Sequence, residues 1–224
     1  MNHPKRLLVF LLALAVITAA GCNAPGTRNA GNANVAAPSN ANAGTAPAAS
    51  DPQALDALTK AMTAQLNARS FRARSDRPGQ ETSTIIEFVA PDRLHVTSDE
   101  DEIIIVGANA WDRKPGGEWQ KFPMDVSQLM ASIRDPEAIQ AIRQNAEVKL
   151  VGPDTLDGMP MTVYEYTIRN IRDPGTTEHS KTWIAVADSL PRRKETEINA
   201  NNQTVRARMT YFDYNADIQI APPK

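Results

Sequence analysis

The spacing of apolar residues changes several times along the chain, and each change marks a different kind of secondary structure. Directly after Asp51-Pro52 the apolar residues recur every three or four positions, at Leu55, Leu58, Met62 and Leu66. This period places them on one stripe of a helix. Asp51 suits the N-cap and Pro52 the first helical position, so the pattern predicts a helix that ends near Asn67.

The pattern then changes to the alternation of apolar and polar residues that is typical of strands. Thr82, Thr84, Ile86 and Phe88 fall on one face of the first clear example, and Leu94 and Val96 on one face of the next. Pro and Gly at Pro78-Gly79 and in the Lys114–Gly117 run mark the turns. We predict strands at 70–77, 81–89, 93–98, 103–106, 108–113 and 118–122.

A helical period returns in the middle of the chain, between residues 125 and 145. Its apolar positions are Leu129, Ile133, Ile139 and Ile142. Because Pro136 follows Asp135, we expect the segment to be broken into two helices there. The alternating pattern resumes after residue 145 and predicts strands at 147–154, 161–170, 181–187, 192–199 and 204–214.

Short strands joined by turns every 8–12 residues indicate one antiparallel meander. A sheet of about ten strands cannot stay flat, because every strand adds twist. The two helical segments are the only elements able to cover its concave face. The sequence therefore predicts an α+β fold: an antiparallel meander sheet curled into an open half-barrel, with helices over the concave face.

The first 22 residues have the layout of a bacterial secretion signal. Lys5 and Arg6 precede a 14-residue apolar run from Leu7 to Ala20, and Gly21 leads to Cys22. The run is shorter than the roughly 20 residues of a membrane-spanning helix, so we expect residues 1–21 to be removed. The small residues before the cysteine resemble a lipoprotein signal, although position 19 is Ala where Leu is usual. This implies acylation of Cys22, and two or more acyl chains anchor a protein stably. The alternative is an ordinary secreted protein with a free thiol.

Residues 22–50 form a different region, in which Ala, Asn, Gly, Pro, Thr and Ser dominate and Arg28 is the one charged residue. Such a segment cannot bury enough apolar surface to offset the entropy of ordering, so we expect a disordered tether. Residues 51–224 then form the folded domain. Asn23 is not the Asp that marks inner-membrane retention in some lipoprotein systems, which favours the outer membrane.

Composition and charge exclude several classes of function. The chain has 24 Lys and Arg against 26 Asp and Glu, and no basic stripe, so we expect no nucleic-acid partner. Cys22 is the only cysteine, so thiol catalysis and Cys-ligated metals are excluded from the domain. His95 and His179 lie in separate segments without metal-ligand spacing, and no activated-serine turn or phosphate loop is present. We expect no enzyme, no cofactor and no metal.

Four stretches together resemble a known family. They are Phe88–Arg93, Trp111 with Trp119–Pro123, Leu156–Gly158 with Val163–Tyr166, and Lys181–Ile184 with Asp188–Arg192. Their order resembles the LolA/LolB-like superfamily of bacterial lipoprotein carriers and lipid-binding lipoproteins of the LppX/LprG type. In that family the last stretch runs W-I-D and then G-L-P, whereas this chain has Ala185 and Ser189 at the corresponding positions. The resemblance implies a half-barrel that binds acyl chains in its concave face and performs no chemistry.

These observations lead to a hypothesis and an alternative. The hypothesis is a membrane-anchored lipoprotein of the bacterial cell envelope, facing the periplasm or in the outer membrane. It would bind or carry a hydrophobic ligand, either a lipid or an acylated lipoprotein, and we expect a monomer. The alternative is a non-enzymatic interaction or sensor module with a filled core. The predicted cavity lining is Ile86, Phe88, Leu94, Val96, Trp111, Leu129, Ile133, Tyr164 and Trp183, although the tryptophans also fit a plain core.

Overall fold

A computed structural model describes residues 50–169, 175–200 and 203–224 of this chain. The expectations for the signal, for Cys22 and for the tether up to residue 49 lie outside these residues. The helices are α2 (Pro52–Leu66), α3 (Ser127–Ile133) and α4 (Pro136–Asn145). The strands are β1 (Ser70–Asp76), β2 (Ser83–Val89), β3 (Arg93–Thr97), β4 (Glu102–Val106), β5 (Asn109–Arg113), β6 (Gln120–Lys121), β7 (Ala146–Leu156), β8 (Met159–Arg169), β9 (Thr177–Ala185), β10 (Pro191–Ala200) and β11 (Gln203–Phe212).

The helix boundaries follow the capping residues in the sequence. The Asp51 carboxylate accepts hydrogen bonds from the backbone N–H groups of Gln53 and Ala54 at the start of α2. Asp135 caps α4 in the same way, and Pro136 at its first position separates it from α3. These caps satisfy N–H groups that have no partner within a helix. The break expected at Pro136 is confirmed.

Most strand bounds lie within two residues of the sequence prediction, and two strands differ more clearly. Strand β6 is reduced to Gln120–Lys121, and β9 begins at Thr177, four residues before its predicted start. The first residues of β9 are Thr, Glu, His and Ser, so they lack the alternation of apolar residues by which strands are recognised. Pairing with β8 and β10 defines this part of the strand instead.

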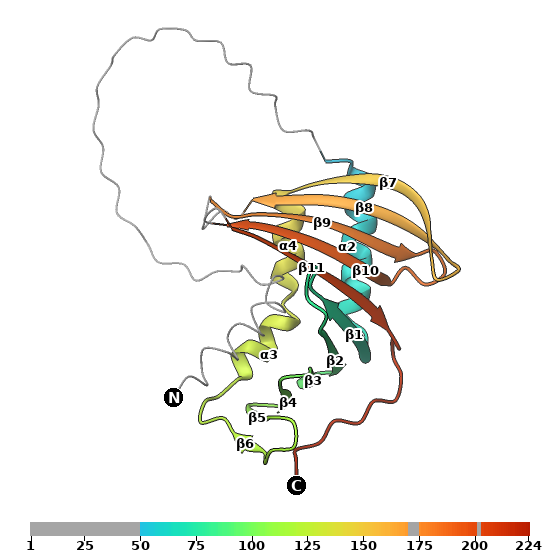
Figure 1. Ribbon diagram of the computed structural model, residues 1–224. Helices are drawn as coiled ribbons and strands as arrows, with labels where there is room; N and C mark the ends of the chain where they lie inside the picture. Colours follow the sequence, from blue (N-terminus) through green and yellow to red (C-terminus); the bar gives the residue numbers. More distant parts are fainter. Residues whose placement is uncertain (1–49, 170–174, 201–202) are drawn as a thin grey trace, which may run out of the picture.

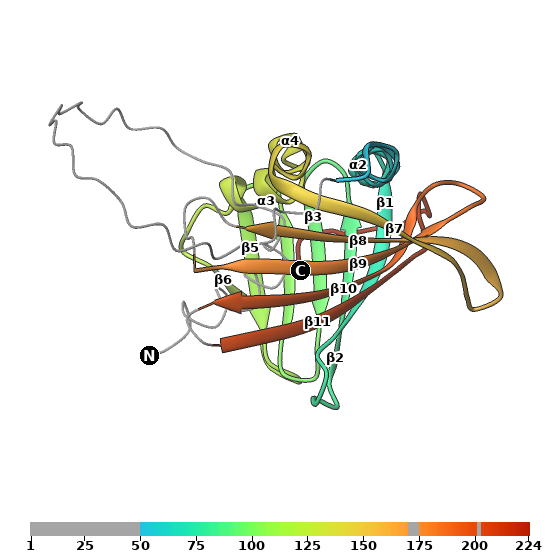
Figure 2. The ribbon, with the colours of Figure 1, turned by 90° about the horizontal axis from the view of Figure 1, so that it is seen from above.

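The strands form one antiparallel sheet in the order β6-β5-β4-β3-β2-β1-β11-β10-β9-β8-β7. Strand β6 and strand β7 are its two edges, so the sheet does not close on itself. Figure 1 and Figure 2 show that strands β1–β5 run across the direction of strands β7–β11, which gives the sheet its curl. The predicted meander and open half-barrel are confirmed.

The helices lie against the concave face of this sheet (Figure 2). Helices α2 and α4 pack on strands β7–β9 through a cluster that includes Leu58, Ile142, Val148 and Ile184. A second cluster joins strands β1–β5 and β11 to Val126 and to Met130 of α3. Each cluster buries apolar side chains between helix and sheet, which is the main favourable contribution to folding.

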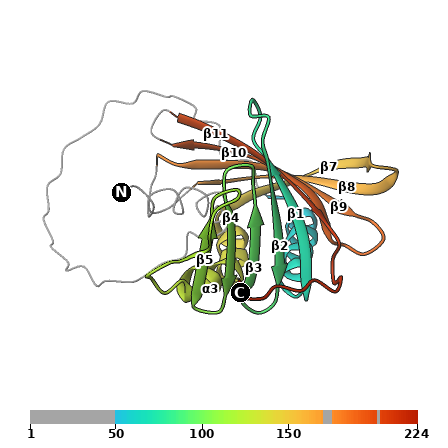
Figure 3. The same ribbon diagram turned by 60° about the horizontal axis from the view of Figure 1, so that its bottom comes forward.

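The residues after β11 run back along the ends of strands β1–β4 (Figure 3). Ser70 donates a hydrogen bond to the carbonyl oxygen of Ala216, and Arg93 donates one to the carbonyl oxygen of Ile220. Ile218 and Ile220 of this segment are buried. Arg93, which belongs to the Phe88–Arg93 stretch of the family resemblance, therefore holds the C-terminal segment in place.

Candidate functional site

The inner face of strands β2–β5 is made of aliphatic and aromatic side chains. Pairing register places residues of neighbouring strands on one face, because directly opposite residues point the same way. We call this set the apolar wall: Ile86, Phe88, Leu94, Val96, Ile103, Ile105 and Ala110. Phe88 is 2% exposed and Leu94 is 1% exposed. The four predicted lining residues on β2 and β3 are thus together, and in this state they are the core under α3.

Helix α3 covers the apolar wall and is short. It has seven residues, begins without a side-chain cap at Val126, and keeps Leu129 and Ile133 half-buried against the cluster that contains the apolar wall. At its end the guanidinium of Arg134 donates to the carbonyl oxygen of Leu66, the last residue of α2. The same guanidinium lies 5.5 Å from the ring centre of Phe88. A few apolar contacts and one arginine therefore hold this cover in place.

The inner face of strands β8–β10 has a different chemistry. Tyr166 pairs with Ser180 and Ser180 with Thr196, while Tyr164 pairs with Thr182 and Thr182 with Lys194. Ile168, Ile184 and Ile198 occupy other positions of the same face. We call the remaining set the polar wall: Tyr164, Tyr166, Glu178, Ser180, Thr182, Lys194 and Thr196. Tyr164, a predicted lining residue, belongs here and is half-buried against the α2–α4 cluster.

An ion pair lies at the centre of the polar wall. The Lys194 ammonium is 3.0 Å from Glu178 Oε1, and the two side chains are 14% and 12% exposed. The same carboxylate oxygen accepts hydrogen bonds from the Tyr166 hydroxyl at 2.9 Å and from the Ser180 hydroxyl at 2.8 Å. Ser180 is also 3.0 Å from the Thr196 hydroxyl. Three strands therefore contribute to one polar network on the inner face.

Both members of this pair are held in their charged forms. Burial acts to raise the pKa of Glu178, but the Lys194 charge and the hydrogen bonds from Ser180, Lys194 and Tyr166 outweigh it, so the pKa is lowered. Burial acts to lower the pKa of Lys194, but Glu178 outweighs it and the pKa is raised. Burial also raises the pKa of Tyr166 to about 12. The network is therefore an ionic one across the physiological pH range.

The structure corrects two of the predicted lining residues, Trp111 and Trp183. Ala110 is the buried residue on β5, so Trp111 points to the convex side, in the row of Ile104 and His95. Trp183 alternates with Thr182 and Ile184 of the inner face and packs outside, in a small cluster with Leu156, Met161, Val163 and Ala185. The error arose because large aromatic residues suit either face, and only register decides between them.

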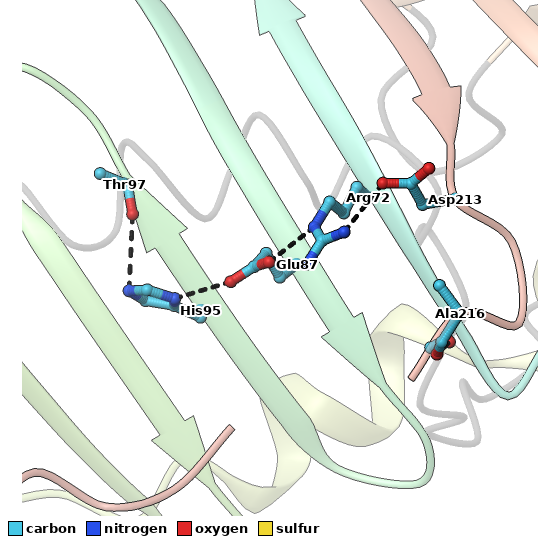
Figure 4. Close-up of polar contacts among 7 residues, drawn as sticks. Arg72, Glu87, His95, Thr97, Asp213 and Ala216 are labelled. Atoms are coloured by element: carbon cyan, nitrogen blue, oxygen red, sulfur yellow. Dashed lines mark hydrogen bonds and ion pairs between the residues drawn. The ribbon is translucent and has the colours of Figure 1, made fainter. Parts of the chain in front are cut away.

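The convex face of strands β1–β5 carries a row of charged and polar side chains (Figure 4). Arg72 contacts Asp213 at 2.8 Å and Glu87 at 2.7 Å. His95 lies between Glu87 and Glu102, with each ring nitrogen 2.9 Å from a carboxylate oxygen. Burial acts to raise the pKa of Glu87, but hydrogen bonds from Arg72 and His95 lower it overall. Cross-strand pairs of opposite charge stabilise a solvated sheet face, which is the role this row performs.

A cavity of about 500 Å³ lies at one corner of the sheet, where the β7–β8 and β9–β10 turns approach the end of β11. Its walls include Leu156, Met159, Leu190, Phe212 and Tyr214. Arg192 also lines it and is 2.5 Å from Asp188. The volume suits a small molecule or a partner side chain. None of the nine predicted lining residues borders this cavity.

The described residues contain neither a candidate metal-binding group nor a helix able to cross a membrane. In residues 50–169, 175–200 and 203–224, His, Asp and Glu side chains do not gather in a group that could hold a metal ion. Over the same ranges, none of the helices combines the length and the apolar composition that crossing a bilayer requires.

Sequence reasoning missed the Glu178–Lys194 pair. Glu178 stands before the predicted start of β9, and Lys194 lies in a strand whose residues look polar on both faces. The available signal was the phase of the alternation. Counting back from Ile184 in steps of two places Thr182, Ser180 and Glu178 on the inner face.

Comparison with solved structures identifies the fold. The crystal structure of the Mycobacterium tuberculosis lipoprotein LppX aligns with a TM-score of 0.60 at 16% identity, over 77% of this chain and 100% of that one. LprF from Mycobacterium bovis aligns with a TM-score of 0.60 at 14% identity, over 79% of this chain and 99% of that one. The chain has an LppX-like fold, as the family resemblance implied. No protein-family model matches the chain, and no curated protein sequence matches it.

Proposed function

We propose that this protein is a membrane-anchored lipoprotein of the bacterial envelope that binds or carries a hydrophobic ligand, a lipid or an acylated lipoprotein. The observation that carries the proposal is the apolar wall, a continuous apolar face of a sheet that never closes, covered by one short helix. The fold shared with the lipoprotein LppX supports it. No chemical step is part of the proposal.

Ligand binding requires α3 to move. Ile86, Phe88 and Leu94 are buried under it, so an acyl chain reaches them only when the helix shifts outward. Burial of acyl methylenes then replaces the contacts of Val126 and Met130, at about 25 cal/mol per Å² of apolar surface. Leu129 and Ile133 are already half-buried and would contact the ligand from the helix side.

The anchor is the second part of the proposal. Acylation of Cys22 would hold the N-terminus in the membrane, and the tether to residue 50 has a stretched reach of roughly 90 Å. A Cys22→Ala variant should therefore leave the membrane fraction, whereas the native chain should resist a salt wash. Release of the native chain by salt alone would contradict acylation of Cys22 as the membrane anchor. It would not affect the proposal of ligand binding.

Ligand binding is tested by native mass spectrometry of the full chain purified from membranes, followed by lipid extraction. A second test places a fluorescent reporter on the inner face with Leu129→Trp. A brominated acyl chain should quench this new tryptophan and not Trp111 or Trp183, which lie on the convex face. Protein that is empty after purification and shows no quenching of the Leu129→Trp reporter would overturn the proposal.

A second function has support of its own. The side chains of the apolar wall are buried, and the cavity at the β7–β8 and β9–β10 turns lies elsewhere, which favours an interaction or sensor module that receives a partner side chain. Pull-down from envelope extracts with and without detergent separates the two functions. Capture of a protein that persists in detergent and is abolished by Met159→Arg at the cavity wall would support the module, because this change leaves the apolar wall intact.

A further inference from the structure

The Glu178–Lys194 pair is unusual for the interior of a fold that binds only hydrocarbon. Removing two charges from water costs several kcal/mol, and apolar residues of similar volume often stabilise a core as well or better. Most ion pairs among the described residues lie on the convex face, where solvent reduces that cost, as for Arg206 and Glu197. A charged network between two apolar clusters therefore calls for a role beyond stability.

The position of the pair suits contact with a ligand. Lys194 pairs with Met209, a half-buried member of the apolar-wall cluster, and Glu178 pairs with half-buried Ile168 and Ile198. Tyr211, in the same cluster, is electrostatically coupled to Lys194. The pair thus lies where the apolar wall gives way to the polar wall, and its side chains keep some exposure.

The charge balance of the pair decides which polar group it would accept. Lys194 is already neutralised by Glu178, so an anionic headgroup would meet a carboxylate as well as an ammonium. An ammonium has three N–H donors and a carboxylate about four acceptor positions, so the pair can bond a further hydroxyl or carbonyl oxygen. A purely apolar chain would leave that capacity unused and would desolvate it.

We propose that the Glu178–Lys194 pair binds the uncharged polar group of an amphipathic lipid, a hydroxyl or ester such as a glycerolipid carries, while its acyl chain lies on the apolar wall. This inference rests on the proposed function and narrows it to a ligand class. The protein then selects neutral glycerol esters over free fatty acids and over hydrocarbons of the same length.

The test uses three probes that share one C18 monounsaturated chain length: 1-monooleoylglycerol, oleate and 1-octadecene. Each probe competes with a fluorescent acyl probe for the full-length protein, and each affinity is compared between variants, so that differences in the solubility of the probes cancel. Glu178→Gln/Lys194→Met removes both charges together. We expect this double variant to bind monooleoylglycerol about tenfold more weakly, which corresponds to the loss of a hydrogen bond to a charged group. Its affinity for octadecene should not change.

The single variant Glu178→Gln gives a change in the opposite direction. It leaves Lys194 cationic without its carboxylate, so oleate should bind about tenfold more tightly than to the native chain. The matched control is Glu195→Gln/Arg208→Met, a pair 2.9 Å apart on the convex side of β10 and β11, which should change none of the affinities. Near-ultraviolet circular dichroism reports whether each variant is folded. If Glu178→Gln does not fold, the Glu178→Gln/Lys194→Met variant alone tests the inference.

Three outcomes would overturn the inference. A folded double variant with native affinity for all three probes would mean that the pair is structural only. A larger loss of affinity for oleate than for monooleoylglycerol in the folded double variant would mean that Lys194 acts as a cation site despite Glu178. Failure of the folded native chain to bind any probe would remove the proposed function itself, and this inference with it.

Discussion

The two walls of the inner face are built on the same sheet, yet they differ in almost every physical respect. The apolar wall uses Ile, Phe, Leu, Val and Ala on strands β2–β5, and its stability comes from packing under α3. The polar wall uses Tyr, Ser, Thr, Lys and Glu on strands β8–β10, and hydrogen bonds and one ion pair hold it together. The difference shows that one curled sheet can present two chemistries on the same face.

The largest effect is expected from opening a gap in the apolar wall. Phe88 is 2% exposed, and its ring centre is 5.2 Å from that of Phe71. Phe88→Ala should lower the free energy of unfolding by about 4 kcal/mol, because it removes buried area and leaves a cavity. Urea unfolding measures it, with Val205→Ala as the control at a 55% exposed position. A loss near that of the control would show that this wall is not packed as described.

Breaking the ion pair should cost almost as much, for a different reason. Lys194→Met leaves the Glu178 carboxylate largely buried without its cation, so we expect a loss of about 3 kcal/mol in the same measurement. Glu178→Gln/Lys194→Met leaves no unpaired charge and should be less destabilising than Lys194→Met alone. If Glu178→Gln/Lys194→Met were less stable to urea than Lys194→Met, the pair would contribute to stability rather than to specificity.

Acid should weaken the polar wall selectively. The folded-state pKa of Glu178 lies below its ordinary value, so its contribution to stability is complete above that value and is lost as the pH falls through the folded pKa. Between pH 7 and pH 3 the native chain should therefore lose more stability than Glu178→Gln/Lys194→Met. Lys194, with a raised pKa, contributes below its ordinary value and loses that contribution only at strongly alkaline pH. Equal acid losses in the two proteins would contradict this assignment.

The smallest effect is expected on the convex face, where solvent screens the charges. Arg208 and Glu195 are 47% and 38% exposed, so Glu195→Gln/Arg208→Met should change the free energy of unfolding by less than about 0.5 kcal/mol. In 1 M salt the difference in the free energy of unfolding between this variant and the native chain should be smaller still. A loss comparable to that of Lys194→Met would remove the contrast between buried and exposed pairs.

The apolar wall could be predicted from the sequence, whereas the polar wall could not. Ile86, Phe88, Leu94 and Val96 stand out because alternation is clear when one face is aliphatic. In β10 most residues are polar and half-buried, so no alternation marks Lys194 as facing inward. Trp111 and Trp183 were placed on the wrong face because a large aromatic residue suits either face, and only the pairing register with the neighbouring strands decides between them. The curl and the cover of helices followed from strand number and from the two amphipathic segments.

Arg134, which directly follows α3, contacts the C-terminal end of α2. Its guanidinium binds the last carbonyl of α2 and lies over Phe88, so an outward shift of α3 also removes a cation from the C-terminal end of α2. Helix α2 starts at Pro52, two residues after Ser50. The Ser50 hydroxyl donates a hydrogen bond to the carbonyl oxygen of Ala146, the first residue of the edge strand β7. If α3 moves outward as proposed, the change would therefore reach the N-terminal end of α2 and its contact with the edge of the sheet.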